Sequence, residues 1–134
     1  MFVAFASPEE VDDIWPVFEA RMQRACDRYR CDLTAPILRQ ICLSGDAYLM
    51  VAHDGERPLM ASVWKFYNWP RGIVFRCLCL AGEDVGRWAD AARAFAIDAA
   101  RAGGAKTISA SGRRGWGAVF PEFREVYRTY EVNV

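Results

Sequence analysis

Three consecutive segments in the middle of the chain carry strand patterns and are separated only by turn sequences. The first two segments, 47–53 and 59–67, flank an Asp54-Gly55 pair, which is typical of a hairpin turn. The third segment, 73–80, follows the turn-forming stretch 68–72, which contains Asn, Pro and Gly. Because connections this short join antiparallel strands, we expect an antiparallel meander, and the rest of the chain must pack around it.

Amphipathic helix patterns lie on both sides of this meander. Residues 7–10 read Ser-Pro-Glu-Glu, a capping sequence, and the apolar residues that follow at helical spacing predict a first helix to about Arg30. A second helix is expected over 34–44. Asp84 is expected to cap a third helix that ends at a Gly-Gly pair and has alanine on its apolar face.

Short segments at the two ends of the chain complete the pattern. Residues 1–6, 106–111 and 125–134 read as strands, and 114–120 reads as a short helix. The predicted order is β-α-α-β-β-β-α-β-α-β, in which the long third helix joins two strands as a parallel crossover. We therefore predict one α+β domain over 1–134, with a mixed, mostly antiparallel sheet and helices on both faces.

Composition excludes several classes of protein. The 134 residues include 17 Lys+Arg and 17 Asp+Glu, so no net positive charge attracts phosphate backbones, and nucleic acid is not expected as a partner. The apolar runs are too short to cross a membrane, and nothing resembles a signal peptide, so we expect a cytoplasmic protein. The five cysteines lack the spacing of metal ligands and are expected to be reduced thiols.

Two parts of the chain resemble the GCN5-related N-acetyltransferase family. Residues 48–55 followed by 59–63 look like the second and third strands of that family, joined by its usual hairpin. Residues 94–96 through 103–108 look like its central helix running into the fifth strand. The resemblance implies an acetyltransferase-like fold and, if the protein is an enzyme, acetyl-CoA as its acyl donor.

In such enzymes the coenzyme's diphosphate lies at the N-terminus of the central helix, where backbone N–H groups attract anions. The matching stretch here is 80–87, so the resemblance assigns Val85, Gly86 and Arg87 to this role if acetyl-CoA is bound. Glu83 and Asp84 precede them, and their carboxylates would repel the ligand by about 1 kcal/mol each if exposed. The acyl-CoA site is therefore interpreted as degenerate, and no cofactor is expected in a protein that has lost it.

The family's general acid is a tyrosine on the short helix after the fifth strand. Here the equivalent position is held by Phe120, which has no hydroxyl and cannot transfer a proton. Tyr127 and Tyr130 are the weak candidates that remain for this role. Arg76 interrupts the strand that would carry a general base. The chain also has one strand fewer at its end than the family, which predicts an open sheet edge for a protein partner or a second copy.

Two kinds of function stay open. The first is a non-catalytic protein that acts through protein contacts, with Trp69 and Trp116 as candidate interface residues. Residues 111–116 also look like part of small acetyltransferase-like proteins of tailed phages, some of which are virion components with a decayed acyl-CoA site. The second is an acetyl-CoA-dependent N-acyltransferase that acts on an amine. An enzyme should have an open split between the strands that end near Leu80 and Ser111, whereas a structural protein should fill it with side chains.

Overall fold

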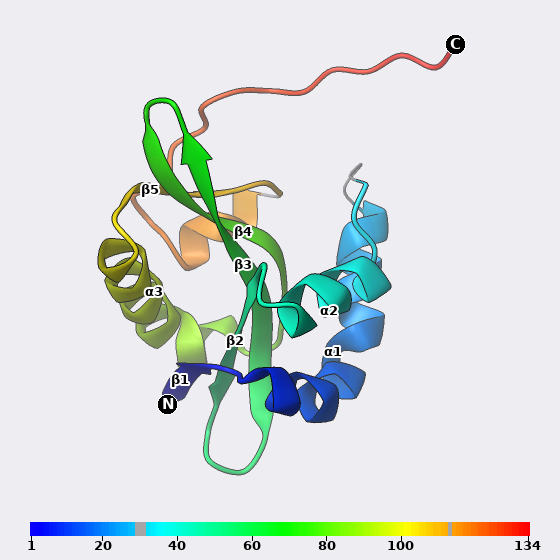
Figure 1. Cartoon of the computed structure of the whole chain (residues 1–134), viewed down its shortest axis with the longest axis vertical. Helices are drawn as coiled ribbons and strands as arrows, with labels where there is room; N and C mark the ends of the chain where they lie inside the picture. Colours follow the sequence, from blue (N-terminus) through cyan, green and yellow to red (C-terminus); the bar gives the residue numbers. More distant parts are fainter. Residues whose placement is uncertain (29–31, 113) are drawn as a thin grey trace.

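The computed structural model describes residues 1–28, 32–112 and 114–134 (Figure 1). The predicted helix end at Arg30, together with Arg113 of the 111–116 stretch, lies outside these residues. The elements in chain order are β1 (Phe2–Phe5), α1 (Pro8–Arg28), α2 (Ala35–Leu43), β2 (Tyr48–His53), β3 (Pro58–Trp69), β4 (Gly72–Gly82), α3 (Val85–Ala102), β5 (Ala105–Ala110) and the 3-10 helix η1 (Arg114–Ala118).

The strands form one five-stranded sheet in the order β1-β2-β3-β4-β5. β2, β3 and β4 pair as consecutive antiparallel strands, which confirms the predicted meander. β1 adds to β2 in antiparallel orientation, and β5 pairs with β4 in parallel orientation after the α3 crossover. The α+β fold with a mixed, mostly antiparallel sheet is therefore confirmed.

Helices cover both faces of the sheet (Figure 1). α1 and α2 pack on one face, where Trp15, Phe18 and Leu38 are fully buried against β2, β3 and β4. α3 packs on the other face through Trp88 and a row of alanines, which allows the helix backbone to approach the sheet closely. Two apolar cores thus hold the sheet between them.

The predicted capping box at the start of α1 is confirmed. The Ser7 backbone N–H donates to the Glu10 carboxylate at 2.9 Å, and the Glu10 N–H donates to the Ser7 hydroxyl at 3.3 Å. These hydrogen bonds lower the pKa of Glu10.

The expected cap at the third helix is different. Asp84 occupies the N-cap position of α3, but its backbone is left-handed, with φ 54°, and its side chain makes no capping hydrogen bond.

The predicted final strand over 125–134 is wrong in this structure. These residues form an extended coil, hereafter the tail, that leaves the body of the molecule near β5 (Figure 1). Strand propensity alone does not form a strand, because the backbone also needs a neighbouring strand to pair with. The tail has strand composition but belongs to no sheet ladder among the described residues.

Candidate functional site

β4 and β5 separate part-way along their length. Their parallel register runs from Ile73 opposite Ala105 to Cys77 opposite Ala110, and there it stops. β4 continues to Gly82, still paired with β3 on its other side. The last residues of β4 therefore present one edge to a space that β5 does not fill.

A cavity of about 450 Å³ occupies this space. α1 forms one of its walls, the start of α3 forms another, and η1 with the residues that follow it forms a third. The residues that line it are mostly apolar: Ala25, Cys26, Leu78, Cys79, Leu80, Gly82, Val85, Trp88, Ser111, Gly115, Trp116, Ala118 and Val119. The split expected of an acyltransferase is thus present as an open apolar cavity.

Few polar groups face this cavity. The Trp88 indole N–H is already used, because it donates to the Glu83 carbonyl at 2.7 Å. The Ser111 hydroxyl accepts from the Arg76 guanidinium, which also donates to Ser109 at 3.2 Å. Among the described residues no group of three His, Cys, Asp or Glu side chains could hold a metal ion. The cavity therefore suits an apolar chain better than a charged one.

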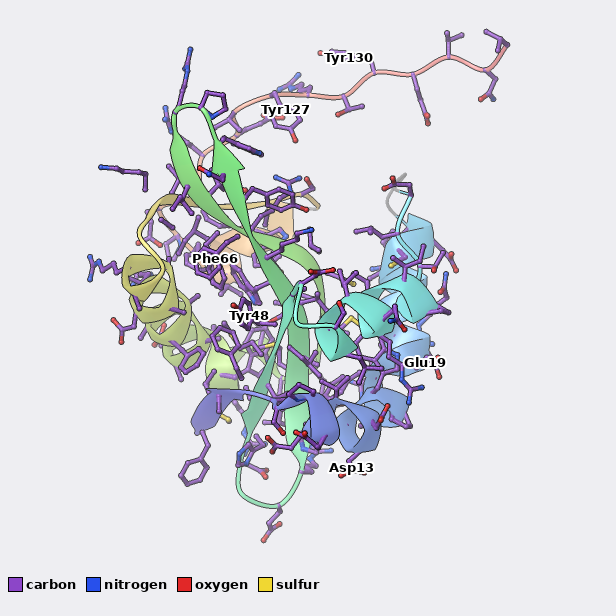
Figure 2. All side chains as sticks on the ribbon, viewed as in Figure 1. Asp13, Glu19, Tyr48, Phe66, Tyr127 and Tyr130 are labelled. Atoms are coloured by element: carbon purple, nitrogen blue, oxygen red, sulfur yellow. The ribbon has the colours of Figure 1, made fainter. Side chains whose placement is uncertain are left out.

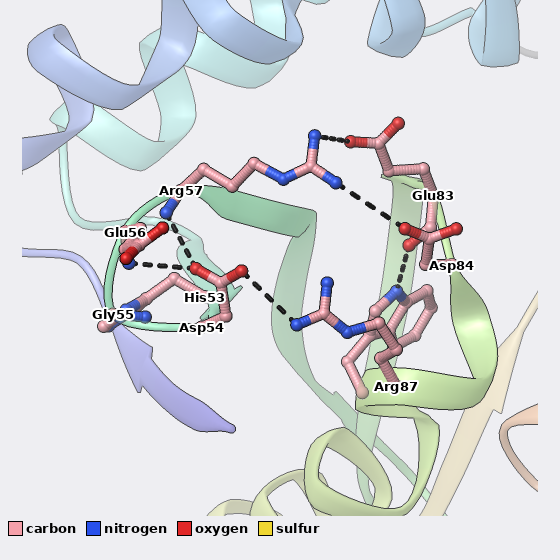
Figure 3. Close-up of polar contacts among 9 residues, drawn as sticks. His53, Asp54, Gly55, Glu56, Arg57, Glu83, Asp84 and Arg87 are labelled. Carbon is pink, nitrogen blue, oxygen red and sulfur yellow. Dashed lines mark hydrogen bonds and ion pairs between the residues drawn. The ribbon is translucent and has the colours of Figure 1, made fainter.

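The connection from β4 to α3 consists of Glu83 and Asp84, and both are tied in place (Figure 3). The Arg57 guanidinium, from the β2–β3 turn, lies 3.2 Å from the Glu83 carboxylate and 3.7 Å from that of Asp84. The Glu83 backbone N–H donates to the Leu59 carbonyl at 3.0 Å. Glu83 and Asp84, which the resemblance puts beside a diphosphate site, are thus paired with an arginine that could otherwise bind an anion.

Arg87 is also engaged with the β2–β3 turn. Its guanidinium lies 3.3 Å from the Asp54 carboxylate (Figure 3). Asp54 accepts the N–H groups of Arg57 and Glu56, each at 2.9 Å, and these bonds, aided by Arg87, lower its pKa to about 2. Of the three residues proposed to cradle a diphosphate, Val85 and Gly86 lie at the exposed first turn of α3, and Arg87 is paired with an acid.

The residue that the resemblance puts at the family's tyrosine position lies inside the protein. Phe120 is buried and stacks on Phe123 with a centroid distance of 4.5 Å. Tyr127 and Tyr130 are not brought to the cavity. Both lie on the tail, with 64% and 84% of their surface exposed (Figure 2). Among the described residues that line the cavity, there is therefore no tyrosine hydroxyl.

The two candidate interface tryptophans have different environments. Trp69, at the end of β3, is 46% exposed and contacts Tyr67. Trp116 is half-buried in η1 and packs against Phe120 and Phe123. It lines the cavity, a role that its Gly-rich sequence context did not indicate. Ala25 and Cys26 of α1 were missed in the same way, because their helical spacing is that of ordinary core residues.

Comparison with known proteins gives no family at the level of sequence. No protein-family model and no curated protein sequence matches the chain. Solved structures do match. A protein described as a probable acetyltransferase aligns over 100% of this chain and 98% of its own, with TM-score 0.71 and 17% identity. The chain has an acetyltransferase fold.

Two further structures with this fold carry different descriptions. The ribosomal-protein-alanine N-acetyltransferase of Brucella melitensis biovar Abortus 2308 aligns over 100% of both chains, with TM-score 0.69 and 11% identity. A transcriptional regulator from Bacillus halodurans C-125 aligns over 99% of both chains, with TM-score 0.64 and 14% identity. At such identities the acetyltransferase fold is established and the activity is not. None of the helices within the described ranges is long and apolar enough to cross a bilayer.

Proposed function

We propose that this protein is a non-catalytic member of the acetyltransferase fold that acts through contacts with other protein chains. The observation that carries the proposal is the burial of Phe120, which the resemblance puts at the tyrosine position and which has no hydroxyl. Transfer of an acetyl group to an amine breaks a carbon–sulfur bond, and the departing thiolate must receive a proton. Among the described residues that line the cavity there is no tyrosine, and the thiols and hydroxyl present are those of Cys26, Cys79 and Ser111.

The β4–α3 connection supports the same proposal. A coenzyme A diphosphate at the start of α3 would meet two carboxylates and would have to compete with them for Arg57. The apolar lining of the cavity between β4 and β5 is suited to the acyl arm of acetyl-CoA, whereas the carboxylates of this connection would repel its diphosphate. A role in a phage virion, which the resemblance to small phage proteins implies, requires no turnover.

The alternative is an acetyl-CoA-dependent N-acyltransferase, and the open cavity favours it. A protein that only needs a stable body gains by filling such a space, because cavities cost stability. In this alternative the N-terminus of α3 would hold the diphosphate, and a tyrosine of the tail would move to the cavity. Arg87 would have to exchange Asp54 for a phosphate oxygen.

Calorimetric titration with acetyl-CoA separates the two proposals. We expect no binding by the unaltered protein and binding by Glu83→Gln/Asp84→Asn, in which Arg57 loses its carboxylate partners and becomes available to a phosphate. The matched control is Glu9→Gln/Asp13→Asn, which removes the same charge from exposed positions on α1. Micromolar binding by the unaltered protein, followed by transfer to an amine, would establish the alternative.

A further inference from the structure

The tail has the composition of a strand, but its side chains are exposed and, among the described residues, it is not paired in the sheet. Its residues alternate along an extended chain, so Val126, Tyr130 and Val132 share one face. These three side chains are 70%, 84% and 82% exposed. Six of its ten residues are β-branched or aromatic and none is proline, a composition typical of a sheet strand. Such a segment is expected to find a sheet edge.

β5 offers such an edge. It is the last strand of the five-stranded sheet, and within the described residues its ladder runs to β4 alone. Its outer backbone groups therefore face away from the sheet, as donors and acceptors for a further strand.

A groove lies between the C-terminal end of this edge and the start of the tail of the same chain. It has a volume of about 490 Å³ and is lined by Ala110, the last residue of β5, by Ser111 and Gly112 after it, by Trp116 and Gly117 of η1, and by residues 123–127 with Thr129. Figure 1 shows the tail running in the same direction as β5. The tail is thus the far wall of the groove, and a strand between the two would be antiparallel to both.

A second copy of this chain supplies a strand in that orientation. A two-fold axis parallel to the sheet normal and passing between two tails makes them antiparallel to each other. Because each tail runs in the direction of its own β5, the partner's tail is then antiparallel to that β5. The order across the dimer becomes β5, partner tail, own tail, partner β5, so both edges and both tails are paired. A tail of this length spans about 34 Å as a strand, longer than the β5 edge.

We propose that residues 125–134 of one copy insert as a strand between β5 and the tail of a second copy, forming a two-fold dimer by reciprocal strand exchange. This inference rests on the proposed function in contacts between chains and names a second copy as the partner. It does not depend on whether acetyl-CoA binds, so calorimetry and measurement of the oligomeric state test the two proposals separately.

Analytical ultracentrifugation of the full chain and of Thr129→Pro tests the exchange. Proline in the middle of the tail removes a backbone donor and cannot continue a ladder, whereas the matched Thr129→Val keeps both the donor and the β-branched side chain. We expect twice the 15.1 kDa chain mass for the unaltered protein and for Thr129→Val, and the single-chain mass for Thr129→Pro. Circular dichroism should show all three folded, because Thr129 is exposed.

A synthetic peptide of residues 125–134 identifies the acceptor. Added to a chain that ends at residue 124, it should bind one peptide per chain, and the same peptide with proline at position 129 should not bind. A dimer that persists without the tail would overturn the proposal. A full chain with the mass of a single copy would also overturn it. Hydrogen exchange would then identify the reason: protected tail amides would mean that the tail pairs with its own β5, and unprotected ones that it pairs with nothing.

Discussion

The spaces on the two sides of β5 differ in the elements that enclose them. On the side facing β4, the space beyond the end of the ladder is a cavity with walls from α1, β4, α3 and η1. On the outer side, the groove has β5 and the η1 region as one wall and an exposed tail as the other. The inner cavity is therefore enclosed by the elements of one chain, whereas the outer groove is the place where we propose that the strand of a second copy inserts.

Trp116 lines both spaces, and its removal is expected to have the largest effect. Trp116→Ala should lower the free energy of unfolding by about 2 kcal/mol, since a half-buried ring is lost from its packing on Phe120 and Phe123. Trp69→Ala is the matched control and should cost about 0.5 kcal/mol or less, because Trp69 is 46% exposed. Urea denaturation measures both, and equal losses would contradict the different roles given to the two tryptophans.

Two glycines beside the inner cavity test how tightly the residues around it are packed. A Cβ on Gly82 would lie 3.0 Å from the Trp88 ring, 3.1 Å from the Leu59 carbonyl oxygen and 3.2 Å from the Met60 Cβ. Gly82→Ala should therefore destabilise the protein by about 1–2 kcal/mol.

Gly86→Ala is the control for this substitution. A Cβ on Gly86 meets nothing within 4 Å, and alanine favours the first turn of α3, so a gain of about 0.5 kcal/mol is expected. Thermal unfolding of both variants gives the comparison. A neutral Gly82→Ala would show that the end of β4 can move away from Trp88.

Phe120→Tyr tests whether the missing hydroxyl can simply be restored. Because Phe120 is buried, the added hydroxyl should cost about 1–2 kcal/mol if no acceptor is within reach, and no acetyl transfer should appear. Phe123→Tyr, at a half-buried position in the same aromatic cluster, should cost less. Transfer from acetyl-CoA to an amine by Phe120→Tyr would show that the cavity needs only this one group to work.

The smallest expected effect concerns the turn beside α3 and depends on pH. Asp54 has its pKa lowered from 3.8 to about 2, so its charged form is favoured in the folded protein. The stabilisation is present above pH 3.8 and is lost as the pH falls towards 2. Asp54→Asn should therefore lower the melting temperature at pH 6 but not at pH 2. A difference that persists at pH 2 would mean that the Asp54 charge is not its source.

Most of the fold could be predicted from local patterns. The Ser7 and Glu10 capping box, the Asp54-Gly55 hairpin and the alanine face of α3 each depend on residues close in sequence, and each is confirmed. Asp84 shows the limit of this reasoning. Its identity predicted a helix cap, but its carboxylate lies near Arg57 instead, a contact between segments far apart in the chain.

The candidate site could be predicted only in outline. A split between β4 and β5 near Leu80 and Ser111 was expected from the resemblance if the protein is an enzyme, and the ladder between the two strands does end early. The walls of this split were not predicted, because Cys26 and Trp116 come from opposite parts of the chain and meet only in the folded structure.

The sequence by itself determined where helices, turns and most strands form, since capping, turn geometry and apolar periodicity act within a few residues. Only the tertiary structure decided which groups meet. It pairs Arg57 with the acids before α3, and it buries Phe120 in the interior of the protein. The tail makes the same division visible. Its residues specify a strand, but a strand exists only against a partner, and a partner is a property of the folded sheet.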